Sequence, residues 1–92
     1  MMTRLTVATA VTEFHATAAS IENWMLDAEG EHDAHLTAQA IANAATETLE
    51  AVPGLWAMYA EGFDVDTRLL RVSISALRNV LAWTNSVARI AA

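Results

Sequence analysis

The sequence predicts an all-α fold, a small helical bundle of three long helices and one short aromatic helix in a single domain, residues 1–92. In three long segments, apolar residues recur every three or four positions, which is the spacing of a helix side that faces a core. Gly30 and the pair Pro53-Gly54 separate these segments, because glycine and proline interrupt helices. With 54% hydrophobic residues, a chain of 92 residues can bury one modest core.

The first segment has a regular apolar side. Its members are Val7, Val11, Phe14, Ala18, Ile21 and Met25. Their spacing predicts a helix with one core-facing seam. The beginning of the chain leaves an alternative open, a short strand or an extended arm over residues 4–12, because β-branched residues alternate there.

The middle segment, residues 34–52, repeats this spacing with smaller side chains. Its seam consists of Ala34, Ala38, Ile41, Ala45, Thr48 and Val52. A seam built mostly from alanine lets a neighbouring helix approach closely. We expect Asp33 to be the N-cap of this helix and Pro53-Gly54 to end it, because proline cannot donate a backbone hydrogen bond.

The last segment, residues 66–92, predicts a long helix whose first turn is capped by Asp66. Drawn at about 100° per residue, its apolar residues, which include Val72, cover one broad side and its arginines the other. This apolar side is wider than a surface helix normally buries. We therefore expect Trp83, Val87 and Ile90 to pair with a second copy of the chain in a homodimer.

Residues 55–63 form a short segment with almost no polar side. Trp56, Tyr59 and Phe63 are spaced three and four apart, which predicts a short helix. Two interpretations stay open. The aromatic side chains either plug one end of the bundle or dock a partner protein, since Trp and Tyr are common interface anchors.

Charge divides the chain into an acidic and a basic block. All eleven acidic residues lie between Glu13 and Asp66, and every basic residue except Arg4 lies from Arg68 onward. The two blocks either neutralise each other in the fold or form an interaction surface. The basic block is a stripe on the last helix, made of Arg68, Arg71, Arg78 and Arg89.

The arginine stripe allows two kinds of partner. It is compatible with a nucleic-acid-associated protein, because arginines along one helix can follow a phosphate backbone. However, the net charge is −6 and lysine is absent, so we favour an acidic protein surface contacted by Arg71 and Arg78.

The turn after the first helix contains residues that bind metals in other proteins. Glu29, His32 and His35 suggest a metal-binding helical bundle as an alternative function, because a Glu-x-x-His spacing places both ligands on one helix side. Gly30 interrupts this pattern and no second Glu-x-x-His occurs. We therefore expect a helix–helix turn and no bound metal.

No pattern in the sequence indicates catalysis. Cysteine and lysine nucleophiles are absent, no serine lies in a nucleophile turn, and the three glycines are isolated. There is no signal-peptide pattern after Arg4 and no run of about 20 apolar residues. We expect a soluble, cytoplasmic, non-enzymatic protein without a cofactor. Its expected function is protein–protein interaction, as a homodimer and as an acidic inhibitor or decoy of a partner.

Overall fold

The computed structural model describes the backbone of residues 4–91 and the side chains of residues 8–89. It contains α1 (Arg4–Glu29), α2 (Ala34–Leu49), α3 (Val52–Ala60) and α4 (Thr67–Ala91), and no strand within the described residues. The predicted all-α fold is therefore confirmed. The alternative of a short strand or extended arm over residues 4–12 is wrong, because α1 is helical from Arg4 onward.

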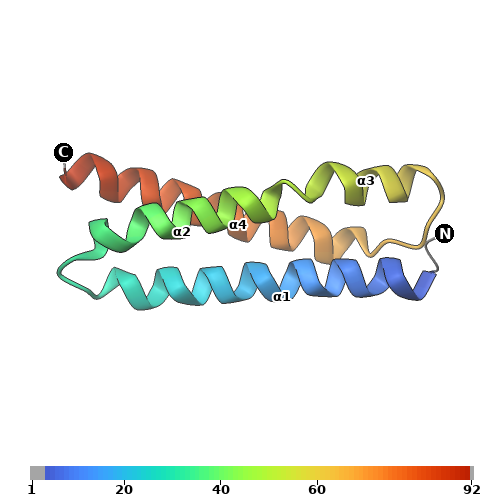
Figure 1. The fold of residues 1–92 in the computed structure, drawn as a ribbon, viewed down its shortest axis with the longest axis horizontal. Coiled ribbons are helices and arrows are strands. Elements are labelled where there is room, and N and C mark those ends of the chain that lie inside the picture. Colours follow the sequence, from blue (N-terminus) through green and yellow to red (C-terminus); the bar gives the residue numbers. More distant parts are fainter. Residues whose placement is uncertain (1–3, 92) are drawn as a thin grey trace.

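The four helices form an elongated bundle of 47 × 20 × 18 Å. α1 runs along its whole length, α2 and α3 return along α1 in succession, and α4 runs back behind them (Figure 1). α1, α2 and α4 pack pairwise against one another, whereas α3 approaches each of the other helices only at a few points. The molecule is thus a three-helix bundle in which α3 is loosely attached.

The core follows the predicted seams of α1 and α2. Val11, Phe14, Ala18, Ile21, Met25, Ala38, Ile41 and Ala45 are buried. Val7 lies outside the residues whose side chains are described. α4 contributes Leu70, Leu77 and Val80, which are all fully buried. These three helices therefore supply most of the apolar contacts that stabilise the bundle.

The predicted end of the middle helix is wrong. α2 ends at Leu49, and Pro53 lies in the first turn of α3 instead of terminating α2. A proline fits this position because the first N–H groups of a helix have no acceptor within it, and because its ring fixes a helical φ. Gly54 is likewise a helical residue. The break between the two helices falls at Glu50 and Ala51.

The aromatic helix is also shifted from its predicted range of residues 55–63. It ends at Ala60, and Phe63 lies in the loop beyond it. Gly62 adopts a φ of 94°, and the N–H groups of Gly62 and Phe63 donate to the carbonyls of Tyr59 and Met58. This pair of bonds around a left-handed glycine is a Schellman motif, which terminates helices.

The start of α4 agrees with the sequence, but one part of its predicted apolar side does not. The backbone N–H of Leu69 donates to Oδ1 of Asp66 at 3.0 Å, which confirms Asp66 as the N-cap. Val72 was expected on the buried side but is 56% exposed, whereas Ser73 is buried. At 100° per residue, Val72 lies roughly 160° from the fully buried Leu70.

Candidate interaction surfaces

Trp56, Tyr59 and Arg71 form an aromatic–arginine cluster where α3 passes α4. The rings of Trp56 and Tyr59 meet edge to face, with centroids 6.0 Å apart. Cζ of Arg71 lies 5.8 Å from the centroid of the Trp56 ring, within the range of a cation–π contact. Tyr59 is 53% exposed, Arg71 is exposed and Trp56 is half-buried. The cluster therefore presents an aromatic ring and a guanidinium to solvent.

Part of the aromatic segment faces the core. Leu55 is buried, and Trp56, Met58 and Phe63 pack against the core with part of their surface exposed. The interpretation that the aromatic side chains cover the bundle therefore holds for part of residues 55–63, and docking of a partner stays a prediction. One side covers the core, and the other carries Tyr59 at the surface.

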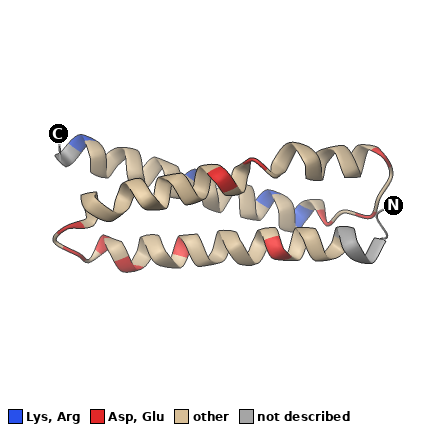
Figure 2. Cartoon of the chain, in the orientation of Figure 1, with Lys and Arg blue, Asp and Glu red and all other residues tan. Residues whose placement is uncertain are grey.

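The four arginines of the stripe are all exposed along α4. Figure 2 shows them on that helix, with the acidic residues along α1, on α2 and in the connecting turns. Among the residues whose side chains are described, no arginine forms an ion pair with a carboxylate. The expectation that the two blocks neutralise each other is therefore not met by direct contacts.

The residues predicted to form a homodimer interface are largely covered within one chain. Trp83 and Val87 are half-buried, and Trp83 packs against the core. The side chain of Ile90 lies outside the described residues. α1 and α2 both pack against α4 and together cover much of its apolar side. The width of that side therefore overstates the apolar surface that is left for a second copy.

The three possible metal ligands lie in or beside the turn between α1 and α2. Glu29 is the last residue of α1, His32 lies in the turn and His35 lies in the first turn of α2. All three are exposed. Within the described residues, no three His, Cys, Asp or Glu side chains gather closely enough to hold a metal ion. The geometry of this region is that of a helix–helix turn, although Asp33 occupies its N-cap position without a side-chain capping bond.

A polar contact between α1 and α4 was not predicted from the sequence. Nδ1 of His15 lies 2.9 Å from Oγ of Ser73, and the Ser73 hydroxyl donates to the carbonyl of Leu69 at 2.8 Å. A hydroxyl has one hydrogen, so when Ser73 donates to Leu69, the tautomer of His15 that carries its proton on Nδ1 donates to Ser73. A catalytic base must instead accept the serine proton. Since Ser73 is also only 1% exposed, the contact is structural.

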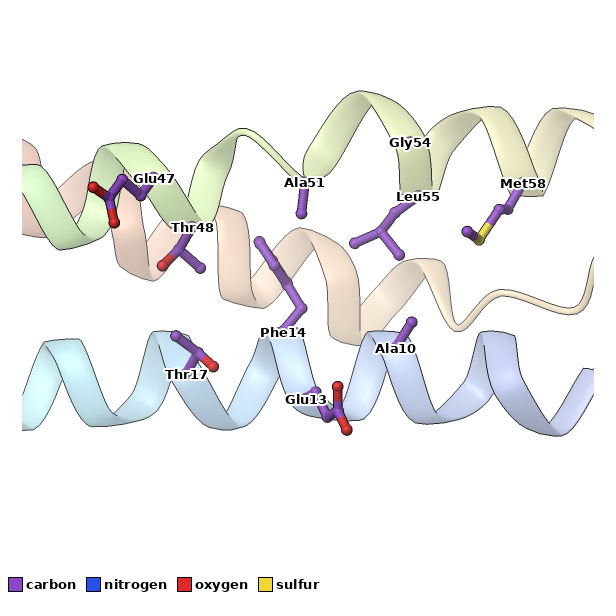
Figure 3. Close-up of a pocket in the computed structure, with 10 residues that line it drawn as sticks. All are labelled: Ala10, Glu13, Phe14, Thr17, Glu47, Thr48, Ala51, Gly54, Leu55 and Met58. Carbon is purple, nitrogen blue, oxygen red and sulfur yellow. The ribbon is translucent and has the colours of Figure 1, made fainter. Parts of the chain in front are cut away.

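A groove between α1 and the α2–α3 junction is the second feature that was not predicted from the sequence. It encloses about 440 Å³ and is drawn in Figure 3. Phe14 points from α1 towards the junction, and Ala51 and Leu55 point back towards α1. Glu13 on α1 and Glu47 on α2 also line it. We call it the α1–α3 groove. No pattern of neighbouring residues predicts this groove, because it depends on where the break at Glu50 and Ala51 falls.

Comparison with known proteins gives no family assignment. No protein-family model, no curated protein and no solved structure matches the chain significantly. No described helix is long and apolar enough to cross a membrane. The features of this chain that bear on its function are therefore the two surfaces and the arginine stripe.

Proposed function

We propose that this chain is a non-enzymatic protein-interaction module that self-associates through the aromatic–arginine cluster. The observation that carries the proposal is the contact among Trp56, Tyr59 and Arg71. Trp, Tyr and Arg are the residue types most enriched among those that dominate binding energy. The ring of Trp56 restrains the guanidinium of Arg71, so less side-chain entropy is lost when a partner binds.

The chemistry of the arginine stripe supports an acidic partner. Arg71 and Arg78 are exposed and have no carboxylate partner within the described part of the chain. A second copy supplies acidic residues along α1 outside the groove, such as Glu22 and Asp27. Complementary charge of this kind favours specificity and rapid association. Trp83 and Val87 extend the proposed contact where they stay partly exposed.

Sedimentation velocity at tens of micromolar tests self-association. We expect a dimer for the natural chain and a monomer for Arg71→Glu with Arg78→Glu. Tyr59→Ala, at a largely exposed position, should raise the dissociation constant about tenfold or more while leaving the fold intact. Arg89→Glu with Arg68→Glu is the matched control, because it changes the same charge towards the two ends of α4.

Two results contradict the proposal. One is a monomeric natural chain at these concentrations. The other is tight binding of a DNA or RNA duplex that weakens steeply with salt, which would favour the nucleic-acid alternative for the same arginines.

The proposal includes a role as an acidic inhibitor or decoy in the cytoplasm. A net charge of −6 supports it, because an acidic surface competes for the basic surface of another protein. The metal-binding alternative has less support, because no three possible ligands gather among the described residues.

A further inference from the structure

We propose that the α1–α3 groove binds a basic amphipathic helix of a partner protein. The apolar side of that helix would lie against Ala10, Ala51 and Met58, above the buried Phe14 and Leu55, and its Lys or Arg residues would pair with Glu13 and Glu47. This inference rests on the decoy role in the proposed function and gives that role a binding site. It uses none of the three residues of the aromatic–arginine cluster.

The walls of the groove are two helical stripes that face each other. α1 contributes Ala10, Glu13, Phe14 and Thr17, which lie on one side of the helix over about 10 Å. The opposite wall begins at Glu47 on α2 and continues to Met58 on α3. A groove between two helices that is open along its length suits a third helix, which inserts apolar residues at positions three and four apart.

Small residues leave the groove unfilled. Ala10, Ala51 and Gly54 line it, and a Cβ atom added at Gly54 would meet no atom within 4 Å. The break at Glu50 and Ala51 explains the space, because α3 does not continue the close packing of α2 against α1. The volume of about 440 Å³ lies within the range of about 300–1,000 Å³ typical of ligand sites. Apolar side chains of a partner can therefore enter without displacing the core.

Charge selects the occupant. Glu13 and Glu47 are the charged residues among those described in the lining, and both are exposed. A neutral helix would remove water from these carboxylates and return no partner to them, which is unfavourable. Lys or Arg residues at the edge of a docked helix would pair with both carboxylates. The occupant we expect is therefore both apolar and basic.

The test uses a synthetic four-turn amphipathic helix of leucine, alanine and arginine, labelled with fluorescein, and a second peptide with glutamine in place of arginine. Fluorescence anisotropy gives the affinity of each for the full chain. We expect the arginine peptide to bind and the glutamine peptide to bind at least about tenfold more weakly. Gly54→Trp should fill the groove and weaken binding of the arginine peptide about tenfold, whereas Gly54→Ala should leave this binding unchanged.

A pair of double variants separates the groove from general acidity. Glu13→Gln with Glu47→Gln should weaken the arginine peptide about fivefold. Glu29→Gln with Glu31→Gln removes the same charge at the α1–α2 turn and should leave binding unchanged. This comparison does not depend on whether Gly54→Trp folds, and circular dichroism verifies the fold of every variant.

Several outcomes would overturn the inference. If both double variants weaken binding of the arginine peptide equally, the net charge of the protein attracts the peptide and the groove does not. Full binding by a folded Gly54→Trp would place the peptide elsewhere. Loss of dimerisation in the groove variants would make the second copy the occupant. Tyr59→Ala should retain peptide binding, so failure of the groove and failure of the aromatic–arginine cluster are distinguishable.

Discussion

Single residues show how polar side chains enter this core without loss of hydrogen bonds. Ser73 and Thr84 are buried, and their hydroxyls donate to the carbonyls of Leu69 and Leu81 at 2.8 Å. Among the described residues, no buried side-chain nitrogen or oxygen lacks a partner. A serine that bonds to its own helix is tolerated on the core side, because its polar group is satisfied locally. Hydropathy alone places Ser73 on the wrong side for this reason.

The contact of His15 with Ser73 should contribute a measurable coupling energy between α1 and α4. We expect a double-mutant cycle of His15→Ala and Ser73→Ala to give about 1 kcal/mol, the net value of a typical hydrogen bond. Urea denaturation supplies the four free energies of unfolding. The cycle cancels the higher helix propensity of alanine at residue 73. The cycle of His15→Ala with Ser75→Ala is the control, because Ser75 is exposed, and a similar coupling there would contradict the assignment.

At the scale of elements, the two aspartates at helix starts should behave differently. Asp66 accepts the N–H of Leu69, whereas Asp33 makes no capping bond. Both substitutions to alanine remove a negative charge from a helix N-terminus. Only Asp66→Ala also removes a hydrogen bond, so it should cost about 1 kcal/mol more than Asp33→Ala. Thermal or urea denaturation measures the difference, and equal costs would refute the capping role of Asp66.

Two glycines offer a second comparison of elements. Gly54 lies in α3 with open space at its Cβ position, so Gly54→Ala should stabilise the fold by about 0.5–1 kcal/mol. Gly62 ends α3 with a φ of 94°, so Gly62→Ala should destabilise it by about 1–2 kcal/mol. Urea denaturation of both variants gives the two signs. Destabilisation by Gly54→Ala would mean that α3 is not helical at that residue.

The elements themselves were predictable because their signals are local. The seams of α1 and α2 and the cap at Asp66 follow from the spacing and type of nearby residues. Pro53 was ambiguous, since a proline is as compatible with the first turn of a helix as with the residues that follow one. The structure places Pro53 in the first turn of α3, whose Leu55, Trp56 and Met58 pack against core residues from distant parts of the sequence.

At the scale of the whole molecule, the interaction surfaces could be predicted only in part. Trp56 and Tyr59 were recognisable as candidate anchors from their residue types and spacing. Their contact with Arg71 depends on the path of the loop between Ala60 and Thr67, which turns the chain back along the bundle (Figure 1). The α1–α3 groove depends on the position of the break at Glu50 and Ala51, which Pro53-Gly54 indicates only approximately. Tertiary geometry, more than composition, therefore determines where this chain can bind.

The charge of the whole molecule leads to a prediction about salt. Eleven acidic and five basic residues give more pairs of like charge than of unlike charge, and no ion pair joins arginine to carboxylate among the described side chains. The bundle is 20 Å or less in its two short dimensions. At about 10 mM salt the Debye length of about 30 Å exceeds this thickness, so carboxylates repel one another across the fold; at about 150 mM it falls to about 8 Å.

Adding sodium chloride from about 10 to about 150 mM should therefore stabilise the fold, because it screens net repulsion without disrupting close ion pairs. We expect a gain on the order of 0.5 kcal/mol, or about 2–4 °C in melting temperature. The measurement is thermal unfolding followed by circular dichroism, at a protein concentration where sedimentation shows one species. Glu29→Gln with Glu31→Gln should reduce the gain in stability, since it makes the net charge less negative. A fall in melting temperature with salt would contradict this prediction. It would mean that attraction between the carboxylates and the arginines of α4 outweighs repulsion between carboxylates, even though no ion pair joins them among the described side chains.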